Sequence, residues 1–205
     1  MAKMNENIRS FKPVNTHFIT REDSEDLIIE GYFAVFNSNY EICQGMSESI
    51  APEAFANSLD RDIRALTNHD STLVLGRTTN GTLKLSVDEK GLYGQIRINP
   101  KDSEAVNTYE RVKRGDVSQC SIGFEIVKEE TEFLDDDSIH WTIREANLWE
   151  VSCCTFPAYE DTQIQARTKQ ADELKRKKLE GWKALMQKRL KEGKDVKNID
   201  DEKKA

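Results

Sequence analysis

The sequence contains few of the residues that hold metal ions or build disulfide frameworks. Only four of its 205 residues are cysteine and only three are histidine. The cysteines are Cys43, Cys120, Cys153 and Cys154. No two of them form a C-x-x-C pair, and adjacent cysteines cannot easily bridge each other. Structural zinc needs four ligands clustered in space, whereas His17, His69 and His140 are scattered along the chain. We therefore expect reduced thiols, no metal and no other cofactor.

Long hydrophobic runs are also lacking. No stretch approaches the roughly 18–20 apolar residues of a membrane span, and the first residues (MAKMNENIRSFKP) lack the apolar run of a secretory signal. Hydrophobic residues make up 37% of the chain, charged residues 33%, and the mean hydropathy is −0.70. These values predict one domain of ordinary size with an appendage, and neither a membrane protein nor a secreted one.

Charge of the two signs is distributed unevenly. Residues 1–161 contain 16 Lys and Arg against 29 Asp and Glu, a net charge of −13; residues 162–205 contain 14 against 8, a net charge of +6, which together give −7. In the basic segment, apolar residues recur at helical spacing at Leu174, Leu179, Trp182, Leu185, Met186 and Leu190. We expect an amphipathic helix there, which either packs weakly on its own domain or docks on a partner. Nucleic acid is not an expected partner, because the acidic part would repel the phosphate backbone.

The acidic part of the chain has the pattern of short β-strands. The predicted strands cover residues 27–36, 81–87, 91–98, 117–127, 139–145 and 148–156, and Gly31 predicts a bulge or bend in the first. Two helices are expected, over 51–59 and from an N-cap at Asn99 to Gly115. The pattern predicts a mainly β (α+β) fold: a closed or nearly closed β-barrel of six or seven strands with peripheral helices. The predicted divisions are a flexible N-terminal arm (1–16), a barrel domain (17–161) and a basic helical tail (162–205).

Two polar motifs can supply a base and a nucleophile. His69 lies in the segment Leu-Thr-Asn-His-Asp, and an imidazole with an ordinary pKa of about 6.5 suits general base catalysis. In the strand at 117–127, alternation places Ser118 on the apolar face and Ser121 on the other, with Gly123. Since a nucleophile must be reachable, alternation favours Ser121, and we expect Gly123 to leave open space beside it. A serine hydroxyl also needs a base to take its proton, which His69 would provide.

A carboxylate stands in an otherwise nearly apolar strand. Glu150 is costly to bury unless another group pairs with it. It either orients a histidine and stabilises its charged form, as the third member of a catalytic triad does, or forms a structural salt bridge. His140 and Glu145 are rivals for the role of third member.

Together these segments resemble the prohead maturation proteases of tailed bacteriophages, serine peptidases distantly similar to herpesvirus assemblin. The resemblance covers roughly residues 26–167 and rests on GYFAVFN, ESIAPEAFANSL, LTNHD followed by LGRT, CSIGF and LWEVSCCTFPAY, in that order. By this resemblance His69 matches the catalytic histidine, Ser121 the serine before hydrophobic-Gly-Phe, and Glu150 the glutamate of the E-V-S strand. The herpesvirus enzymes use a second histidine as third member, so His140 stays open as an alternative.

The resemblance implies a serine endopeptidase with a barrel fold, packaged inside an immature capsid in the host cytoplasm. There it would digest scaffold and the scaffold-like segment of the major capsid protein, and cleave itself. Self-association or encapsidation would accompany activity, and the basic tail would direct packaging or be removed. Two other classes remain: a catalytically inactive capsid-assembly or scaffold protein with a docking tail, and a β-barrel binding module with no viral role.

Overall fold

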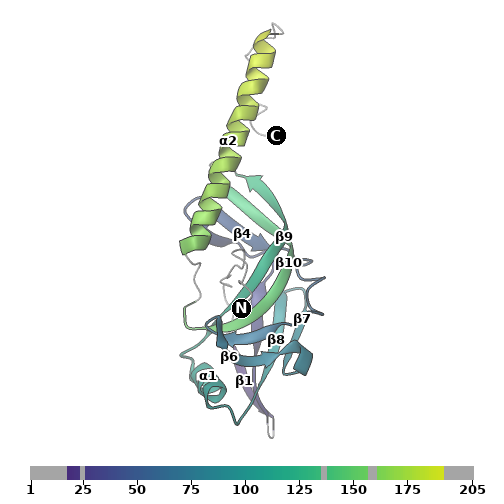
Figure 1. Ribbon diagram of the computed structural model, residues 1–205, viewed down its shortest axis with the longest axis vertical. Coiled ribbons are helices and arrows are strands. Elements are labelled where there is room, and N and C mark those ends of the chain that lie inside the picture. The colour runs from purple at the N-terminus through teal and green to yellow at the C-terminus, as the bar shows by residue number, and fades with distance from the viewer. Residues whose placement is uncertain (1–17, 24–25, 135–137, 157–160, 192–205) are drawn as a thin grey trace.

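The computed structural model describes residues 18–23, 26–134, 138–156 and 161–191 (Figure 1). Within these residues the chain forms ten strands, two α-helices and one short 3-10 helix, and the strands belong to two sheets. A mainly β fold with helices is thereby confirmed. The predicted N-terminal arm lies outside the described residues.

The first sheet has four strands, all antiparallel, in the order β1-β2-β8-β7. They are β1 (Ile19–Asp23), β2 (Asp26–Val35), β8 (Gly91–Ile98) and β7 (Leu83–Val87). The β7–β8 pair confirms the predicted hairpin. The register of β2 against β8 shifts between Tyr32 and Ala34, close to Gly31, where a bend was predicted.

The second sheet has six strands and is organised by its longest strand. The order is β3-β4-β10-β5-β6, with β9 also paired to β10. Its strands are β3 (Tyr40–Cys43), β4 (Met46–Ile50), β5 (Arg64–Thr67), β6 (Asp70–Arg77), β9 (Gln119–Phe133) and β10 (Ile139–Cys154). β10 pairs with β9 along its length, in parallel with β4 at one end, and in parallel with β5 at the other. The segments before His69, around Ser121 and around Glu150 are therefore neighbours.

Two predictions about strands need correction. The strands expected at 139–145 and 148–156 are one strand, whose register against β9 shifts between residues 143 and 150, at the predicted break. The described strands form two separate hydrogen-bonded sheets and not one closed sheet, so the closed barrel is not confirmed. Side chains of both sheets, such as Phe33 and Phe124, share one core. Alternating apolar residues fit a barrel and two packed sheets equally well, so the pattern could not distinguish them.

The first helix, α1 (Ser103–Arg114), begins later than predicted. Its N-cap is Asp102, whose side chain accepts hydrogen bonds from the backbone N–H groups of Glu104 and Ala105, while Asn99 only caps a turn before it. Gly115 ends the helix in the left-handed conformation, as predicted. Residues 51–59 form consecutive turns with i to i+3 hydrogen bonds rather than the expected helix. A 3-10 helix, η1 (Thr78–Asn80), follows β6.

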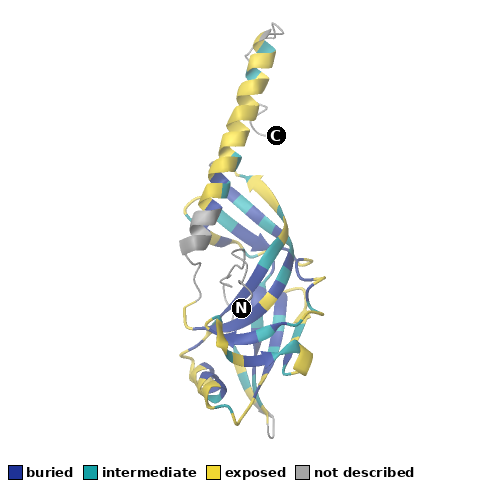
Figure 2. Ribbon diagram, in the orientation of Figure 1, coloured by how far each residue is buried: buried dark blue, intermediate teal, exposed yellow. Residues whose placement is uncertain are grey.

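The second helix, α2 (Asp161–Lys191), confirms the helix predicted in the basic segment. Arg167 and Ala171 are buried against the end of the second sheet, and Leu174 is partly buried there. Farther along, α2 extends away from both sheets, and its residues are almost all exposed (Figure 2). None of the helices described here is long and apolar enough to cross a membrane.

Candidate active site

His69 occupies a tight turn between β5 and β6. Thr67 pairs with Asp70 across this turn, and its two central residues, Asn68 and His69, have φ angles of 51° and 60°. These values indicate a type I′ turn, in which glycine is usual at the position that His69 occupies. Asn68 secures the turn to β10, because its N–H donates to the carbonyl of Cys153 at 2.9 Å. The backbone that carries the imidazole is therefore fixed to the strand that carries Glu150.

The imidazole of His69 contacts the carboxylate of Glu150 directly. The distance between Nδ1 and Oε1 is 2.6 Å, and the side chains are 32% and 12% exposed. The other oxygen, Oε2, accepts a hydrogen bond from Ser152 Oγ at 2.6 Å. Ser152 Oγ in turn accepts one from the backbone N–H of His69 at 3.1 Å. His69, Glu150 and Ser152 form a closed hydrogen-bonded group, which we call the His69 cluster.

Gly123 makes room for this carboxylate. Gly123 pairs with Glu150 across the β9–β10 ladder. A Cβ atom added to Gly123 would lie closer to Oε1 of Glu150 than side chains tolerate, and 3.0 Å from its Cγ. The prediction that Gly123 leaves open space beside Ser121 is therefore wrong, because the side chain of Glu150 fills that space.

Ser121 lies beside the cluster, on the neighbouring strand. It pairs in register with Ser152, so both side chains point to the same face of the sheet. Directly opposed residues of an antiparallel pair have Cβ atoms about 4.5–5.5 Å apart. Alternation along β9 therefore places Ser121 on the face that carries the His69 cluster. That face is not open, since Ser121 is fully buried, whereas Ser118, just before the strand, is exposed. The expectation that Ser121 is the more reachable serine is therefore wrong.

A family model for the caudovirus prohead serine proteases matches residues 15–177. The chain belongs to this family. It is 32% identical over 148 residues to the prohead protease of Enterobacteria phage HK97, covering 70% of this chain and 61% of that protein, so the chain spans about three fifths of its relative's length. The solved bacteriophage T4 capsid assembly protease, gp21, is 10% identical with a TM-score of 0.43, covering 73% of this chain and 96% of that one.

The residues that match the prohead protease family include the whole His69 cluster, and its contacts change the proton affinity of the histidine. Burial lowers the pKa of His69, but hydrogen bonds to the Cys154 thiol and the Glu150 carboxylate, together with the charge of Glu150, raise it to about 10. The cluster therefore holds an imidazolium beside a carboxylate at neutral pH. A histidine in this state can act as a base only after it loses that proton.

The two rival residues lie elsewhere in this prohead protease fold. His140 is near the other end of β10, where Ser47 Oγ lies 2.8 Å from its Nδ1 and Ser49 Oγ lies 2.9 Å from its Nε2. Glu145 accepts a hydrogen bond from the side chain of Asn57 at 3.0 Å. The structure thus brings His69, Glu150 and Ser121 together and leaves both rivals outside the group.

Two residues of this region were missed at the level of sequence. Ser152 and Cys154 follow Glu150 at alternate positions of β10, and alternate residues of a strand share one face. That spacing was the available signal. It was weak, because serine and cysteine are ordinary residues in a buried strand.

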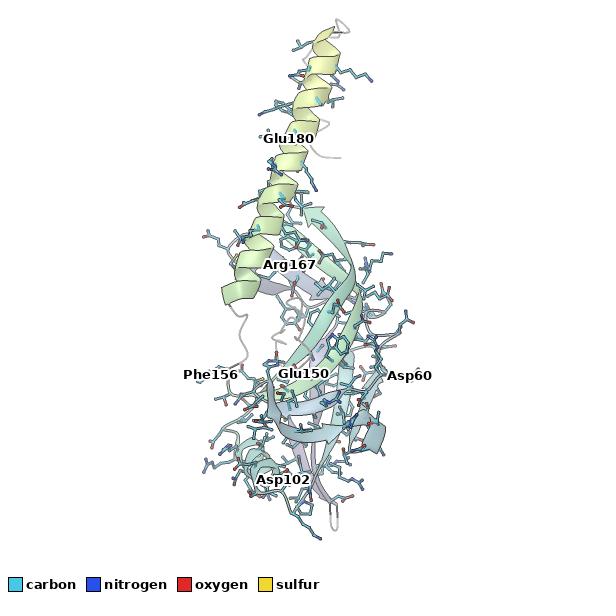
Figure 3. The ribbon with its side chains drawn as sticks, viewed as in Figure 1. Asp60, Asp102, Glu150, Phe156, Arg167 and Glu180 are labelled. Carbon is cyan, nitrogen blue, oxygen red and sulfur yellow. The ribbon has the colours of Figure 1, made fainter. Side chains whose placement is uncertain are left out.

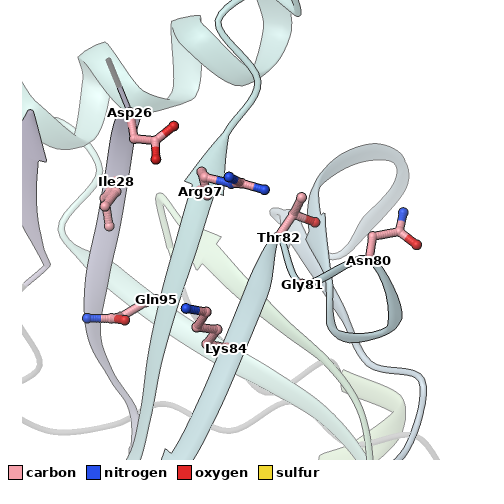
Figure 4. A pocket seen from close by; sticks show the side chains of 8 residues that line it. All are labelled: Asp26, Ile28, Asn80, Gly81, Thr82, Lys84, Gln95 and Arg97. Atoms are coloured by element: carbon pink, nitrogen blue, oxygen red, sulfur yellow. The ribbon is translucent and has the colours of Figure 1, made fainter. Parts of the chain in front are cut away.

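Two pockets border different parts of the molecule. One, of about 380 Å³, lies against the first sheet and is lined by residues such as Lys84, Gln95 and Arg97, none of which belongs to the His69 cluster (Figure 4). A smaller one, of about 240 Å³, is lined by Thr67 and residues 72–75 of the hairpin that carries His69, and by the start of α1. Across the part of the chain that the structure describes, no three His, Cys, Asp or Glu side chains are grouped to hold a metal ion.

Proposed function

We propose that this chain is a serine endopeptidase of phage capsid maturation, with Ser121 as nucleophile, His69 as base and Glu150 as the group that orients His69. The observation that carries the proposal is the 2.6 Å contact between Nδ1 of His69 and Oε1 of Glu150, with Ser121 on the neighbouring strand opposite Ser152 of the same cluster. These residues come from three separate segments, and a serine, a histidine and a carboxylate are the set that nucleophilic acyl transfer requires.

The chemistry follows from the roles of the three side chains. The imidazolium first loses the proton on Nε2 to water; Glu150 then accepts the hydrogen bond of Nδ1–H and leaves Nε2 as the basic nitrogen. Nε2 takes the proton of Ser121, whose oxygen attacks the scissile carbonyl. His69 then gives this proton to the leaving amine, and water hydrolyses the acyl-enzyme by the same sequence of steps. No cofactor enters any of these steps.

The substrate chain would approach from the side of the β5–β6 hairpin. His69 is the most exposed member of its cluster, whereas Ser121 and Ser152 are fully buried. The pocket of about 240 Å³ adjoins this hairpin at Thr67 and has room for side chains of an extended peptide. Binding there must also uncover Ser121, so substrate binding and rearrangement of the site are coupled in this proposal.

We further propose that the substrates are scaffold and the scaffold-like segment of the major capsid protein, cleaved inside the immature capsid in the infected cell, with self-cleavage of the chain. Membership in the prohead protease family supports this assignment. Encapsidation, or self-association, would concentrate enzyme and substrate.

The basic helix supplies the packaging contact in this proposal. Beyond Lys178, α2 carries the exposed side chains Leu179, Trp182, Leu185 and Leu190, 39–63% exposed, which we call the apolar stripe. Residues 179–191 contain four Lys and Arg against one Glu, a net charge of +3. Because a second copy of this helix would be repelled, we assign the stripe to an acidic amphipathic helix of the capsid or scaffold protein.

The packaging role of the apolar stripe is tested by assembling proheads with variant proteases and measuring how much protease they contain. Leu179→Ser with Trp182→Ser should remove most protease from purified proheads while self-cleavage in solution is unchanged. Ala184→Ser, an exposed residue of the same helix outside the stripe, is the control. Normal incorporation of the double variant would refute this assignment.

The test of the catalytic assignment is intact mass over time, for the full chain alone and with purified capsid protein. Wild type and Ser118→Ala should cleave, and Ser121→Ala should not, because loss of the nucleophile lowers the rate by several orders of magnitude. Ser118 is an exposed serine close by, which makes it the matched control. Cleavage by Ser121→Ala would overturn the assignment of Ser121 as the nucleophile. A wild type that cleaves neither itself nor capsid protein would favour the alternative, an inactive assembly protein with a docking tail.

A further inference from the structure

Ser152 contacts both other members of the His69 cluster, the Glu150 carboxylate and the backbone of His69. It lies on β10 and has no exposed surface. Its hydroxyl donates to Oε2 of Glu150 at 2.6 Å and accepts from the backbone N–H of His69 at 3.1 Å. One atom therefore holds both the carboxylate and the turn that carries the imidazole.

The hydrogen-bonding capacity of Ser152 leaves it a limited set of roles. A serine hydroxyl has one proton and two lone pairs. The proton goes to Glu150 and one lone pair receives the N–H of His69. Toward Ser121, which it faces across the ladder, Ser152 can then only accept a hydrogen bond. This arrangement suits a residue that positions its neighbours and does not suit a second nucleophile, whose proton would have to pass to a base.

We propose that Ser152 is a positioning residue that fixes the Glu150 carboxylate and the His69 backbone in one geometry, and so keeps Nδ1 and Oε1 in contact. This inference rests on the proposed roles of His69 and Glu150. The turn at His69 has a positive φ, so it needs external hydrogen bonds to hold it, and Ser152 provides one of them. The carboxylate lies against Gly123, and Ser152 holds one of its oxygens while the other contacts the imidazole.

The chain offers a matched control for the loss of this hydroxyl. Ser58 is also fully buried, and its Oγ accepts the N–H of Leu148, a residue of the same strand, at 2.5 Å. Ser58→Ala, like Ser152→Ala, removes a buried hydroxyl that accepts a backbone N–H, but it does not touch the His69 cluster. A merely structural role for Ser152 would make the two variants behave alike.

The experiment measures peptidase kinetics and the NMR titration of His69 in the full chain, for both variants and wild type. For Ser152→Ala we expect kcat to fall about 10- to 100-fold with KM nearly unchanged, the loss typical of one hydrogen bond to a charged group. We also expect the pKa of His69 to fall and its backbone amide to exchange faster, whereas Ser58→Ala should leave both unchanged.

Three outcomes would overturn this role. If Ser152→Ala leaves kcat, the His69 titration and the amide exchange as in wild type, Ser152 positions nothing. If it abolishes cleavage as fully as Ser121→Ala while the His69 titration is unchanged, Ser152 takes part in the chemistry itself. The titration and the amide exchange need no substrate, so they test the positioning role even if the assignment of Ser121 fails. A kinetic loss matched by Ser58→Ala would mean a general effect on folding.

Discussion

A charged cluster lies at each end of β10, and the two clusters differ in burial and in the kind of cation they contain. At one end is the His69 cluster, partly open to solvent. At the other, Arg167 of α2 lies 2.9 Å from the Glu48 carboxylate and 2.8 Å from that of Glu129. We call this group the Arg167 cluster. Figure 3 shows Glu150 and Arg167 well separated along the long axis of the molecule.

The difference between the clusters lies in the cation. The side chains of Arg167 and Glu48 are 2% and 1% exposed, and the guanidinium lies 4.5 Å from the centre of the Trp141 ring. An arginine keeps its proton in a protein, so the Arg167 cluster can hold a helix in place but cannot transfer a proton. A histidine can do so, once its environment permits. The same strand thus supports one cluster that anchors and one that is suited to chemistry.

The largest expected effect comes from breaking the anchor. Arg167→Met removes the guanidinium from the buried carboxylate of Glu48, and breaking a buried ion pair on one side costs about 3–5 kcal/mol. We expect urea denaturation to show a free energy of unfolding lower by about that amount. The measurement is the unfolding midpoint at constant m-value.

Arg144 provides the control for the anchor. It pairs with Glu53 and Glu130 but is 36% exposed, so Arg144→Met should cost less than about 1 kcal/mol. An equal decrease in the free energy of unfolding for Arg167→Met and Arg144→Met would mean that the Arg167 cluster stabilises the fold no more than a surface ion pair does.

A smaller effect is expected from crowding the His69 cluster. Gly123→Ala puts a methyl group against Oε1 of Glu150 and 3.0 Å from its Cγ, and overpacking of this kind costs typically about 1–3 kcal/mol. Because Glu150 has to move, cleavage activity should fall by more than stability alone explains. Thermal unfolding and peptidase assays on the same sample measure both.

The control for crowding is a glycine with open surroundings. Gly181, in the exposed part of α2, has open space where a Cβ would be added: apart from its chain neighbours and the nearby helix backbone, no atom lies within 4 Å. Gly181→Ala should be neutral or stabilising, by up to about 1 kcal/mol, with unchanged activity. A Gly123→Ala variant with wild-type activity would show that the position of Glu150 is unimportant.

The sequence indicates which segments come together in the candidate site better than it indicates their surroundings. Local motifs, strand alternation and the resemblance to the prohead proteases selected His69, Ser121 and Glu150, whose segments are neighbours in the second sheet. The burial of Ser121 depends on how two sheets pack, which no local pattern encodes. Asn99 and Asp102 are both good N-caps, so only tertiary packing decides between them. The Arg167 cluster was missed because no local pattern links Arg167 to Glu48, 119 residues away, or to Glu129, 38 residues away.

The most local effect is expected from Glu150→Gln, which keeps the volume of the side chain and removes its charge. Without that charge the pKa of His69 should fall from about 10 toward its ordinary value. The acid limb of the activity profile should then move to lower pH, with a lower maximum, since the amide stabilises the imidazolium less well. In the wild type, folding raises the pKa of His69. The contact of His69 with Glu150 therefore stabilises the fold fully below about pH 6.5, and this stabilisation is lost as the pH rises through about 10.

Glu145→Gln tests whether the pKa of His69 depends on Glu150 in particular or on any nearby negative charge. Glu145 is on the same strand but bonds Asn57 and not the imidazole. Its variant should therefore leave both the NMR titration of His69 and the acid limb in place. If Glu145→Gln shifts the titration as much as Glu150→Gln does, the summed negative charge of residues 1–161, rather than one carboxylate, sets the proton affinity of His69. The contrast between the two ends of β10 would then reflect net charge, and the 2.6 Å contact would lose its role in the proposed mechanism.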